Sequence, residues 1–495
     1  MPADNDPIQH VVVLMFENRS FDQMLGILQT VYPSLDGIDP NAPPRSNLDH
    51  EGNRIEQRET QETVVDPDPN HDLISVLTQI ESPLPEPNDL TPSYSFVQRV
   101  GRFFAWIFRV ALSYLPVRRR MVARMGLPVY QGNFAAVYSE QHPKTNVDQR
   151  QQVMGYFPRG FLPALHALAL DFTICDHWFA SVPGSTWPNR CYVHTGTSRG
   201  RASTPEKWQD FSALHLYDQA TLYDRLNERN VSWKVYHDGL PQSLVLSHQQ
   251  ERQNKKRYQS MEDFKADAAG VATAFPQYAF IEPCYKAGGN DDHPPNDTME
   301  AQRLLAMVYN SIRSNPDLWP STLLVVIYDE HGGFFDHVCP PATVRPDRFR
   351  DDYRFDQLGV RVPALLISPW VRRGVFSETL DHTSLLRYLT DKWKLGPLGD
   401  RVAQATSIEN AIVDVRRGDA DTIAHIEVPK RMAAAAAVEP AQLNENQIAL
   451  RELAHFLETK VRPQEAMVKR GAMMAVPPRQ QLEIAEEQIR TFLES

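Results

Sequence analysis

The sequence predicts an α/β fold built on a mainly parallel sheet. Residues 323–328 are an apolar run rich in β-branched and aromatic types, which is typical of a strand buried on both faces. Residues 8–16 form a second run of this kind. Both runs stop at acidic and amide side chains, and the carboxyl ends of parallel strands border the crevice where α/β proteins bind ligands. We therefore expect a site where these two strands end.

The bulk composition is that of a globular protein. Its 495 residues, 42% hydrophobic and 23% charged, suffice for one large α/β domain with additions. A net charge of −11 argues against a general nucleic-acid-binding protein. The four cysteines form no CxxC pair, so neither a thiolate zinc site nor a dense disulfide framework is predicted. The polar start, with no run of transmembrane length, predicts a cytoplasmic protein or one exported by a leaderless route.

The first predicted strand runs into Glu17, Asn18 and Ser20. Asn18 or Ser20 could simply cap the helix predicted at residues 21–28, but a helix N-terminus also favours anions. Residues 29–94, rich in Pro, Asn and Asp, predict a long irregular connection. His71 lies within it, and its spacing alone gives it no function.

Residues 95–125 have a different character, with seven arginines, many large apolar residues and no acid. A basic, aromatic helix of this kind suits a lipid surface. The alternative is a helix packed in the core, with its arginines paired to acids elsewhere. On the first interpretation, the predicted membrane contacts are Phe103, Phe104, Trp106 and Ile107.

A turn containing glycine and proline follows the helix predicted at residues 147–170 and a short strand after it. Its sequence is Pro183-Gly-Ser-Thr-Trp-Pro-Asn-Arg190. A hydroxyl in such a turn can face a crevice as a nucleophile if a metal or a base activates it. Ser185 and Thr186 both fit that role, and an ordinary turn is the alternative.

The second half of the chain alternates strands and helices. Further strands are predicted at residues 231–237, 278–282 and 364–368, with a polar surface helix or loop at 247–268. Asn296 or Asp297 is the predicted N-cap of a helix that continues to about residue 314. Residues 381–384 begin another helix. Beyond about residue 408, leucines at helical spacing predict a mostly helical extension without chemistry of its own.

The acids at the strand ends predict a metal site. Adjacent carboxylates such as Asp329 and Glu330 repel each other and lose solvation unless a cation holds them. Oxygen and imidazole ligands suit a divalent metal, and His331, Asp336 and His337 follow closely. A polar strand end entering a turn is the simpler alternative.

With these residues in hand, the chain resembles the phosphoesterase family of phosphatidylcholine-hydrolysing phospholipases C and related acid phosphatases. The resemblance covers about residues 8–395 in one collinear order. The stretches that carry it are Glu17-Asn-Arg-Ser-Phe-Asp22, Asp68-Pro-Asn-His71, the turn ending at Arg190, Asp292-His-Pro294, Tyr328-Asp-Glu-His-Gly-Gly-Phe-Phe-Asp-His-Val338 and Asp381-His-Thr-Ser384. Residues 95–125 resemble an insertion, and residues after 400 lie outside the match.

This resemblance implies an alkaline-phosphatase-like three-layer α/β sandwich and assigns roles to residues. The nucleophile position falls on Thr186. The implied metal ligands are Glu17, Asn18, Thr186, Asp329 and Glu330. Histidines near the phosphoryl group correspond to His71, His293 and His337, and we expect Asn189 and His331 to bind phosphate. Zinc, calcium and manganese are all admissible as the metal.

The predicted function is a metal-dependent phospholipase C that acts through a phospho-threonine. The alternatives are an acid phosphatase or phosphodiesterase for soluble substrates, and a non-catalytic lipid-binding protein. The expected partners are phospholipid and a membrane surface, with homo-oligomer formation through residues 95–125 or the C-terminal extension as a further expectation. We expect a phosphoesterase domain at residues 1–405 and a helical extension at 406–495.

Overall fold

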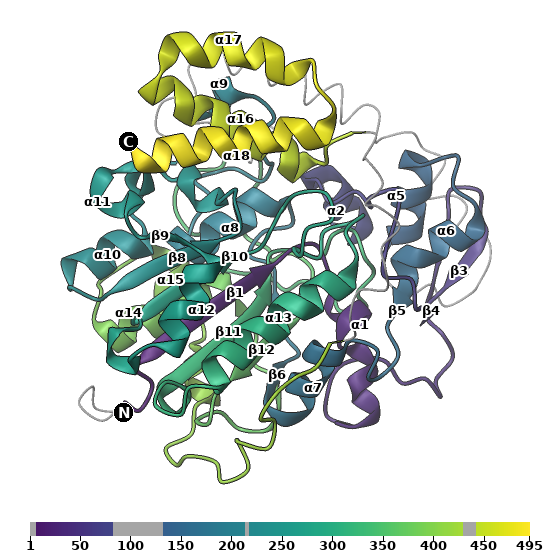
Figure 1. The fold of residues 1–495 in the computed structure, drawn as a ribbon. Coiled ribbons are helices and arrows are strands. Elements are labelled where there is room, and N and C mark those ends of the chain that lie inside the picture. Colours follow the sequence, from purple (N-terminus) through teal and green to yellow (C-terminus); the bar gives the residue numbers. More distant parts are fainter. Residues whose placement is uncertain (1–5, 83–131, 213–216, 429–441) are drawn as a thin grey trace.

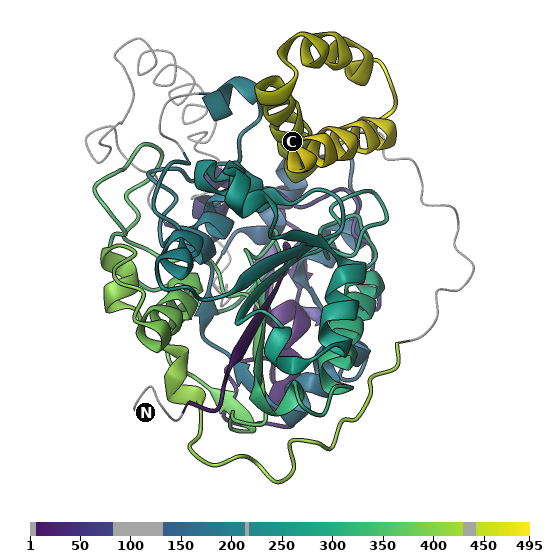
Figure 2. The same cartoon turned by 60° about the vertical axis from the view of Figure 1, so that its left-hand side comes forward.

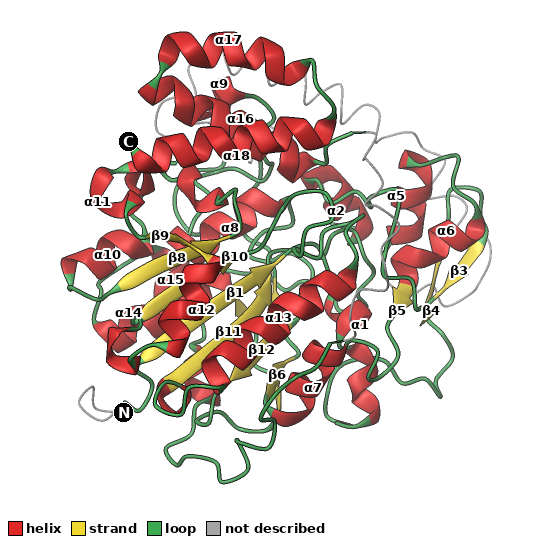
Figure 3. Cartoon of the chain, viewed as in Figure 1, coloured by secondary structure: helices red, strands yellow, loops and turns green. Residues whose placement is uncertain are grey.

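The computed structural model describes residues 6–82, 132–212, 217–428 and 442–495. Its centre is an eight-stranded sheet in the order β13-β6-β12-β11-β1-β10-β8-β9 (Figure 3). In that order the strands are Gly374–Phe376, Thr173–Cys175, Ala364–Ile367, Thr322–Tyr328, His10–Phe16, Tyr278–Glu282, Trp233–His237 and Tyr258–Ser260. All neighbours pair in parallel except at β12, which is antiparallel to β11 and β6. The predicted mainly parallel α/β sheet is confirmed.

Strands β1 and β11 lie side by side at the middle of the sheet. All seven residues of each strand are buried, as their continuous apolar sequences predict. They pair in register from His10 opposite Thr322 to Phe16 opposite Tyr328. Because the two strands end at the same level, Glu17 and Asp329 leave the sheet next to each other.

Helices cover both faces of the sheet and complete a three-layer sandwich (Figure 2). One group of neighbouring helices comprises α7 (Pro163–Asp171), α12 (Met261–Ala269) and α13 (Thr298–Arg313). The other comprises α8 (Thr186–Thr195), α10 (Leu222–Glu228), α14 (His382–Trp393) and α15 (Asp400–Gln404). Helix α13 shows why they pack: Leu304, Leu305, Val308 and Ile312 recur at helical spacing and are buried. Its N-cap is Asp297, one of the two predicted candidates.

Short elements surround this sandwich. The small strands are β2 (Ser46–Leu48), β3 (Arg54–Glu56), β4 (Arg58–Glu59), β5 (Gly155–Tyr156), β7 (Trp178–Phe179) and β14 (Leu380–Asp381). The short helices are α1 (Phe21–Met24), α2 (Leu73–Gln79), α5 (Phe134–Gln141), α6 (Val147–Gln151), α9 (Trp208–Ser212) and α11 (Arg252–Lys255). The 3-10 helices are η1 (Gly26–Thr30), η3 (Gln152–Met154), η4 (Gln242–Val245), η5 (Ser247–Gln250), η6 (Ala272–Ala274), η7 (Trp319–Ser321) and η8 (Ile408–Ala411).

Two of the predicted elements are wrong in detail. The helix expected at residues 147–170 is two helices, α6 and α7, separated by β5 and a loop through Pro158. The described part of the predicted connection, residues 29–82, is less irregular than predicted, since it includes α2, which Asp72 caps by accepting from the backbone N–H groups of Ile74 and Ser75.

The C-terminal extension is a three-helix unit packed on the body of the molecule (yellow in Figure 1). It consists of α16 (Glu445–Val461), α17 (Pro463–Met474) and α18 (Pro478–Glu494). Leu450, Leu453, Leu457, Leu482 and Ile489 belong to the same buried cluster as the central strands. The helical extension predicted from leucine spacing is therefore present, and it shares the core of the α/β body.

Among the helices within the described ranges, none is both long and apolar enough to cross a bilayer. The proposed membrane contacts Phe103, Phe104, Trp106 and Ile107 lie outside the described residues.

Candidate active site

The site begins where β1 and β11 end. The backbone N–H of Asn18 donates to Asp329 Oδ1 over 3.1 Å, and that of Arg19 donates to the Glu330 carbonyl over 3.1 Å. Asn18 has a φ of 57°, a conformation that amide side chains tolerate better than most. A Cβ on Gly332 would lie 2.3 Å from the Asn18 carbonyl oxygen, so only glycine permits this close approach. The two strand ends are thus locked together.

Thr186 is the first residue of α8 and faces Asn18. Its Oγ1 lies 3.4 Å from Asn18 Oδ1, and its side chain is buried. The start of a helix exposes backbone N–H groups and a partial positive charge, which favours an anionic group. Ser185, the N-cap, makes no side-chain capping bond. Of the two hydroxyls that the sequence offered, the Thr186 hydroxyl is the one that the structure pairs with a strand-end residue.

Two buried carboxylates at the site keep one oxygen without a partner. Glu17 Oε2 and Glu330 Oε1 have no hydrogen-bond partner among the residues that the structure describes. Burial raises the pKa of Glu17 well above its ordinary value. Burial, with Glu330 nearby, also raises the pKa of Asp329 to about 7, although Arg190 opposes this shift. A bound cation would relieve this excess of buried negative charge.

The donor set suits such a cation. Carboxylate, amide and hydroxyl oxygens come from Glu17, Glu330, Asn18 and Thr186, and hard divalent ions prefer these ligands. Both oxygens of Asp329 already accept hydrogen bonds. Oδ1 accepts from the backbone N–H groups of Asn18 and Glu330, and Oδ2 accepts from Arg190 Nε over 3.0 Å. The residues present fit a metal ion, with Asp329 offering only its remaining lone pairs.

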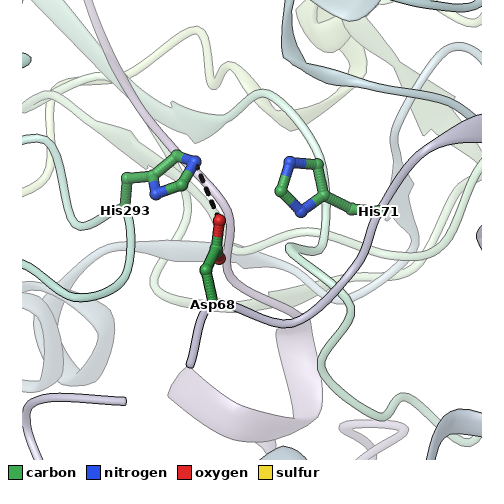
Figure 4. A group of neighbouring side chains, drawn as sticks. All are labelled: Asp68, His71 and His293. Atoms are coloured by element: carbon green, nitrogen blue, oxygen red, sulfur yellow. Dashed lines mark ion pairs between the residues drawn. The ribbon is translucent and has the colours of Figure 1, made fainter. Parts of the chain in front are cut away.

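Asp68, His71 and His293 form a group beside these acids (Figure 4). The ring centroids of the two histidines are 5.7 Å apart, and His293 Nε2 lies 3.8 Å from Asp68 Oδ2. His71 Nε2 lies 3.2 Å from Asn18 Nδ2 and 3.9 Å from Glu330 Oε1. His71 therefore connects this group to the strand ends and to Thr186.

The two histidines differ in charge. Burial alone would lower the pKa of His71, but Glu330, Asp68 and Glu445 outweigh it and raise the pKa to about 10. Burial, reinforced by the neighbouring His71, lowers the pKa of His293 to about 3. His71 Nδ1 lies 2.8 Å from the Pro69 carbonyl oxygen, and His293 Nδ1 lies 2.6 Å from the Pro294 carbonyl oxygen. In neutral His293, Nδ1 donates to that carbonyl, and the Nε2 lone pair is left for a proton or a metal.

Asn189 and His331 have partners that do not fit the predicted phosphate contact. The Asn189 amide nitrogen donates to the carbonyls of Val182, Gly184 and Ser185, so it shapes the turn before Thr186. His331 contacts Glu330 Oε2 at 3.2 Å and Gln79 Oε1 at 2.9 Å. Both side chains hold site residues in place, and their polar atoms are already engaged.

His337, predicted to act near the phosphoryl group, lies in another cluster. Its Nδ1 is 2.9 Å from Asp22 Oδ2 and its Nε2 is 2.9 Å from Asp36 Oδ1, so both ring nitrogens are occupied. Asp22, Asp336 and His337 have the geometry of a metal site. Arg361 fills it instead, pairing with Asp336 at 2.9 Å and with Asp22 at 3.1 Å. The expected catalytic role of His337 conflicts with this placement.

Several site residues were missed by sequence reasoning. Arg190 pairs with both Asp329 and Glu17, at 3.0 and 3.3 Å. Its place at the end of the Pro183–Arg190 turn, four residues after Thr186, was the sequence feature that could have indicated this role. The first turn of α16 also reaches the site: Asn446 Nδ2 donates to Glu17 Oε1 over 2.8 Å. Nothing in the spacing indicated this contact, because the two residues are 429 positions apart.

Comparison with known proteins agrees with this chemistry. A profile of the phosphoesterase family matches residues 8–396, most of the chain. The chain belongs to the phosphoesterase family. Among its relatives, non-specific phospholipase C3 of Arabidopsis thaliana is 33% identical over 396 residues, covering 74% of this chain and 64% of the relative. The non-hemolytic phospholipase C of Pseudomonas aeruginosa is 28% identical and covers 59% and 50%. The chain thus spans less than two thirds of the length of either relative.

The similarity also extends beyond the family match. Non-specific phospholipase C5 of Arabidopsis thaliana is 28% identical, covering 94% of this chain and 86% of its own length. The family match itself ends at residue 396, as expected, but an alignment that leaves out only about 6% of the chain must enter the C-terminal extension. Among solved structures, murine ectonucleotide pyrophosphatase/phosphodiesterase 5 overlaps 51% of this chain and 94% of its own, with 12% identity and a TM-score of 0.32.

Proposed function

We propose that this phosphoesterase is a metal-dependent phospholipase C. It would cleave phosphatidylcholine-type lipids into diacylglycerol and the phosphorylated headgroup. The observation that carries the proposal is the placement of Thr186. Its hydroxyl lies at a helix start, 3.4 Å from Asn18 Oδ1, in a site where Glu17 and Glu330 each keep one buried oxygen without a hydrogen-bond partner among the described residues. The phospholipase C relatives support the lipid substrate.

In this mechanism Glu17, Asn18, Asp329 and Glu330 would hold the ion, which when bound lowers the pKa of the Thr186 hydroxyl and screens phosphoryl charge. Thr186 Oγ1 would release its proton to solvent as it forms a bond to phosphorus, and the bond from phosphorus to the glycerol oxygen would break. His71, whose pKa the neighbouring carboxylates of Asp68 and Glu445 help to raise, would donate a proton to that leaving oxygen. Water then cleaves the phospho-threonine, and Thr186 regains its proton.

The ligand types bear on which metal would bind. The oxygen donors at the strand ends favour calcium or manganese, whereas a site that included His71 and His293 would favour zinc. We expect one tightly bound ion at the strand ends.

A product assay tests the function. Phosphatidylcholine liposomes, p-nitrophenyl phosphorylcholine and p-nitrophenyl phosphate would each be supplied with and without a chelator. We expect diacylglycerol from liposomes and nitrophenol from the phosphorylcholine ester, both lost with chelator. Turnover of p-nitrophenyl phosphate alone would identify a phosphatase instead. No turnover of any substrate by the metal-loaded protein would favour a lipid-binding role.

We further propose that residues 95–125 dock the enzyme on membranes. The support is their sequence of arginines and large apolar residues without acids. Replacing Phe103, Phe104, Trp106 and Ile107 with serine should reduce hydrolysis of liposomal lipid and spare p-nitrophenyl phosphorylcholine. Equal loss of both activities with a lower melting temperature would instead indicate a core or oligomer interface.

A further inference from the structure

The first turn of α16 brings an amide into the site from the far end of the chain. Asn446 is 2% exposed, and its Nδ2 donates to Glu17 Oε1 over 2.8 Å. Its Oδ1 accepts from Trp187 Nε1 over 2.7 Å. An indole N–H can only donate, so this bond fixes which end of the Asn446 amide faces Glu17.

This contact determines how Glu17 presents its carboxylate. Oε1 receives Asn446 and, at 3.3 Å, Arg190, so both neighbours lie on one oxygen. Oε2 is the buried oxygen that has no partner in the described part of the chain. Asn446 thereby holds Glu17 so that its free oxygen is available to a ligand. Because Trp187 follows Thr186 directly, the same amide joins Glu17 to the start of α8.

The rest of the turn strengthens this placement. Gln447 Nε2, in the same turn, donates to the Tyr285 carbonyl over 2.9 Å. Behind the turn, Leu450, Leu453 and Leu457 anchor α16 in the core. The turn is therefore held from both sides and cannot shift without disturbing the helix packing.

We propose that Asn446 is a positioning residue that orients Glu17 for metal binding, so that the C-terminal helical unit forms one wall of the active site. This inference rests on the proposed function in taking Glu17 as a metal ligand. Hydrogen-bonding partners of metal ligands typically contribute about tenfold to a hundredfold in metal affinity.

The test measures binding of Mn²⁺ to the full-length, metal-free protein, from the free-ion signal in electron paramagnetic resonance. A double-mutant cycle compares the wild type with Glu17→Gln, Asn446→Leu and the double variant. We expect each single change to weaken Mn²⁺ binding about tenfold or more, and the double variant to bind no more weakly than Glu17→Gln. Trp187→Phe should weaken binding in the same direction by less, because the Asn446 amide would lose only its orienting donor.

Leu453→Ala is the matched control for lost stability, since it removes a buried side chain from the core face of the same helix. It should lower the melting temperature and leave Mn²⁺ affinity within about twofold, because Leu453 lies about two helical turns beyond Asn446. If Glu17→Gln weakens binding but Asn446→Leu does not, or if the two effects add, Asn446 does not act through Glu17. If Glu17→Gln itself leaves affinity unchanged, the metal assignment in the proposed function is wrong instead.

Discussion

Two clusters of acids and histidines lie close together in the sequence and differ in how their charge is balanced. One is the group of Asp68, His71 and His293, in which His71 Nε2 lies 3.9 Å from Glu330 Oε1; the other contains Asp22, Asp336 and His337. In the second, Arg361 supplies an internal cation, and each carboxylate oxygen of Asp22 and Asp336 has a partner. In the first, His293 Nε2 has none within the described ranges, and neither has Glu330 Oε1 beside it or Glu17 Oε2 at the end of the neighbouring strand.

This difference distinguishes a site that needs a ligand from one that is complete. Buried polar groups are normally hydrogen-bonded, so the unpartnered oxygens of Glu17 and Glu330 at the ends of two neighbouring strands indicate an absent partner. The active-site cluster should therefore control activity and metal binding, and the Arg361 cluster should control stability. Each prediction below separates these two properties.

The largest expected effect is on activity in the first cluster. Thr186→Ala should lower kcat by several orders of magnitude. Catalytic residues act as one unit, so removing the nucleophile alone abolishes most of the rate enhancement that the whole unit provides. Melting temperature should change little. Ser185→Ala, one residue away, is the control and should retain most activity. An inactive Ser185→Ala beside a nearly normal Thr186→Ala would reverse the assignment.

The next largest expected effect is on the amount of metal bound to the protein. Glu330→Gln removes charge from a buried oxygen that has no partner, so bound metal and activity should both be lost. Elemental analysis of the purified variant measures this directly. Asp68→Asn should keep the single ion; finding two ions in the wild type and one in Asp68→Asn would instead show that Asp68, His71 and His293 hold a second metal.

The second cluster should respond in stability. Arg361→Met leaves Asp22 and Asp336 buried without their cation, which should cost about 3–5 kcal/mol of unfolding free energy. The exposed pair of Arg345 and Asp356 provides a control, where Arg345→Met should cost less than about 1 kcal/mol. Chemical denaturation measures both. Normal stability of Arg361→Met would contradict the structural role.

The smallest expected effect is a pH dependence in the same cluster. Burial alone would lower the pKa of His337, but Asp22, Asp36 and Asp336 outweigh burial and raise this pKa to about 9. A raised folded-state pKa gives stability that is fully present below about pH 6.5 and is lost as pH rises through about 9. His337→Gln should therefore be less stable than the wild type at pH 6, by on the order of 2–3 kcal/mol, and nearly equal at pH 9.5. A constant difference at both pH values would be inconsistent with this origin.

Sequence reasoning predicted the features that depend on local pattern. Continuous apolar runs located β1 and β11, and parallel register then explains why their terminal acids meet. It failed where a partner comes from far along the chain. His337 follows the acid motif, but Arg361 and Asp22 decide its environment. Asn446 sits at the start of a leucine-patterned helix, and only the packing of that helix brings it to Glu17.

The central claim is that Thr186 forms a covalent bond to phosphorus during turnover. Rapid acid quenching of the enzyme with p-nitrophenyl phosphorylcholine, followed by mass spectrometry of its peptides, tests this most directly. The account predicts phosphorylcholine attached to the peptide containing Thr186, absent in Thr186→Ala and in protein stripped of metal. The adduct on any other residue, or a full burst of nitrophenol with Thr186 unmodified, would contradict it.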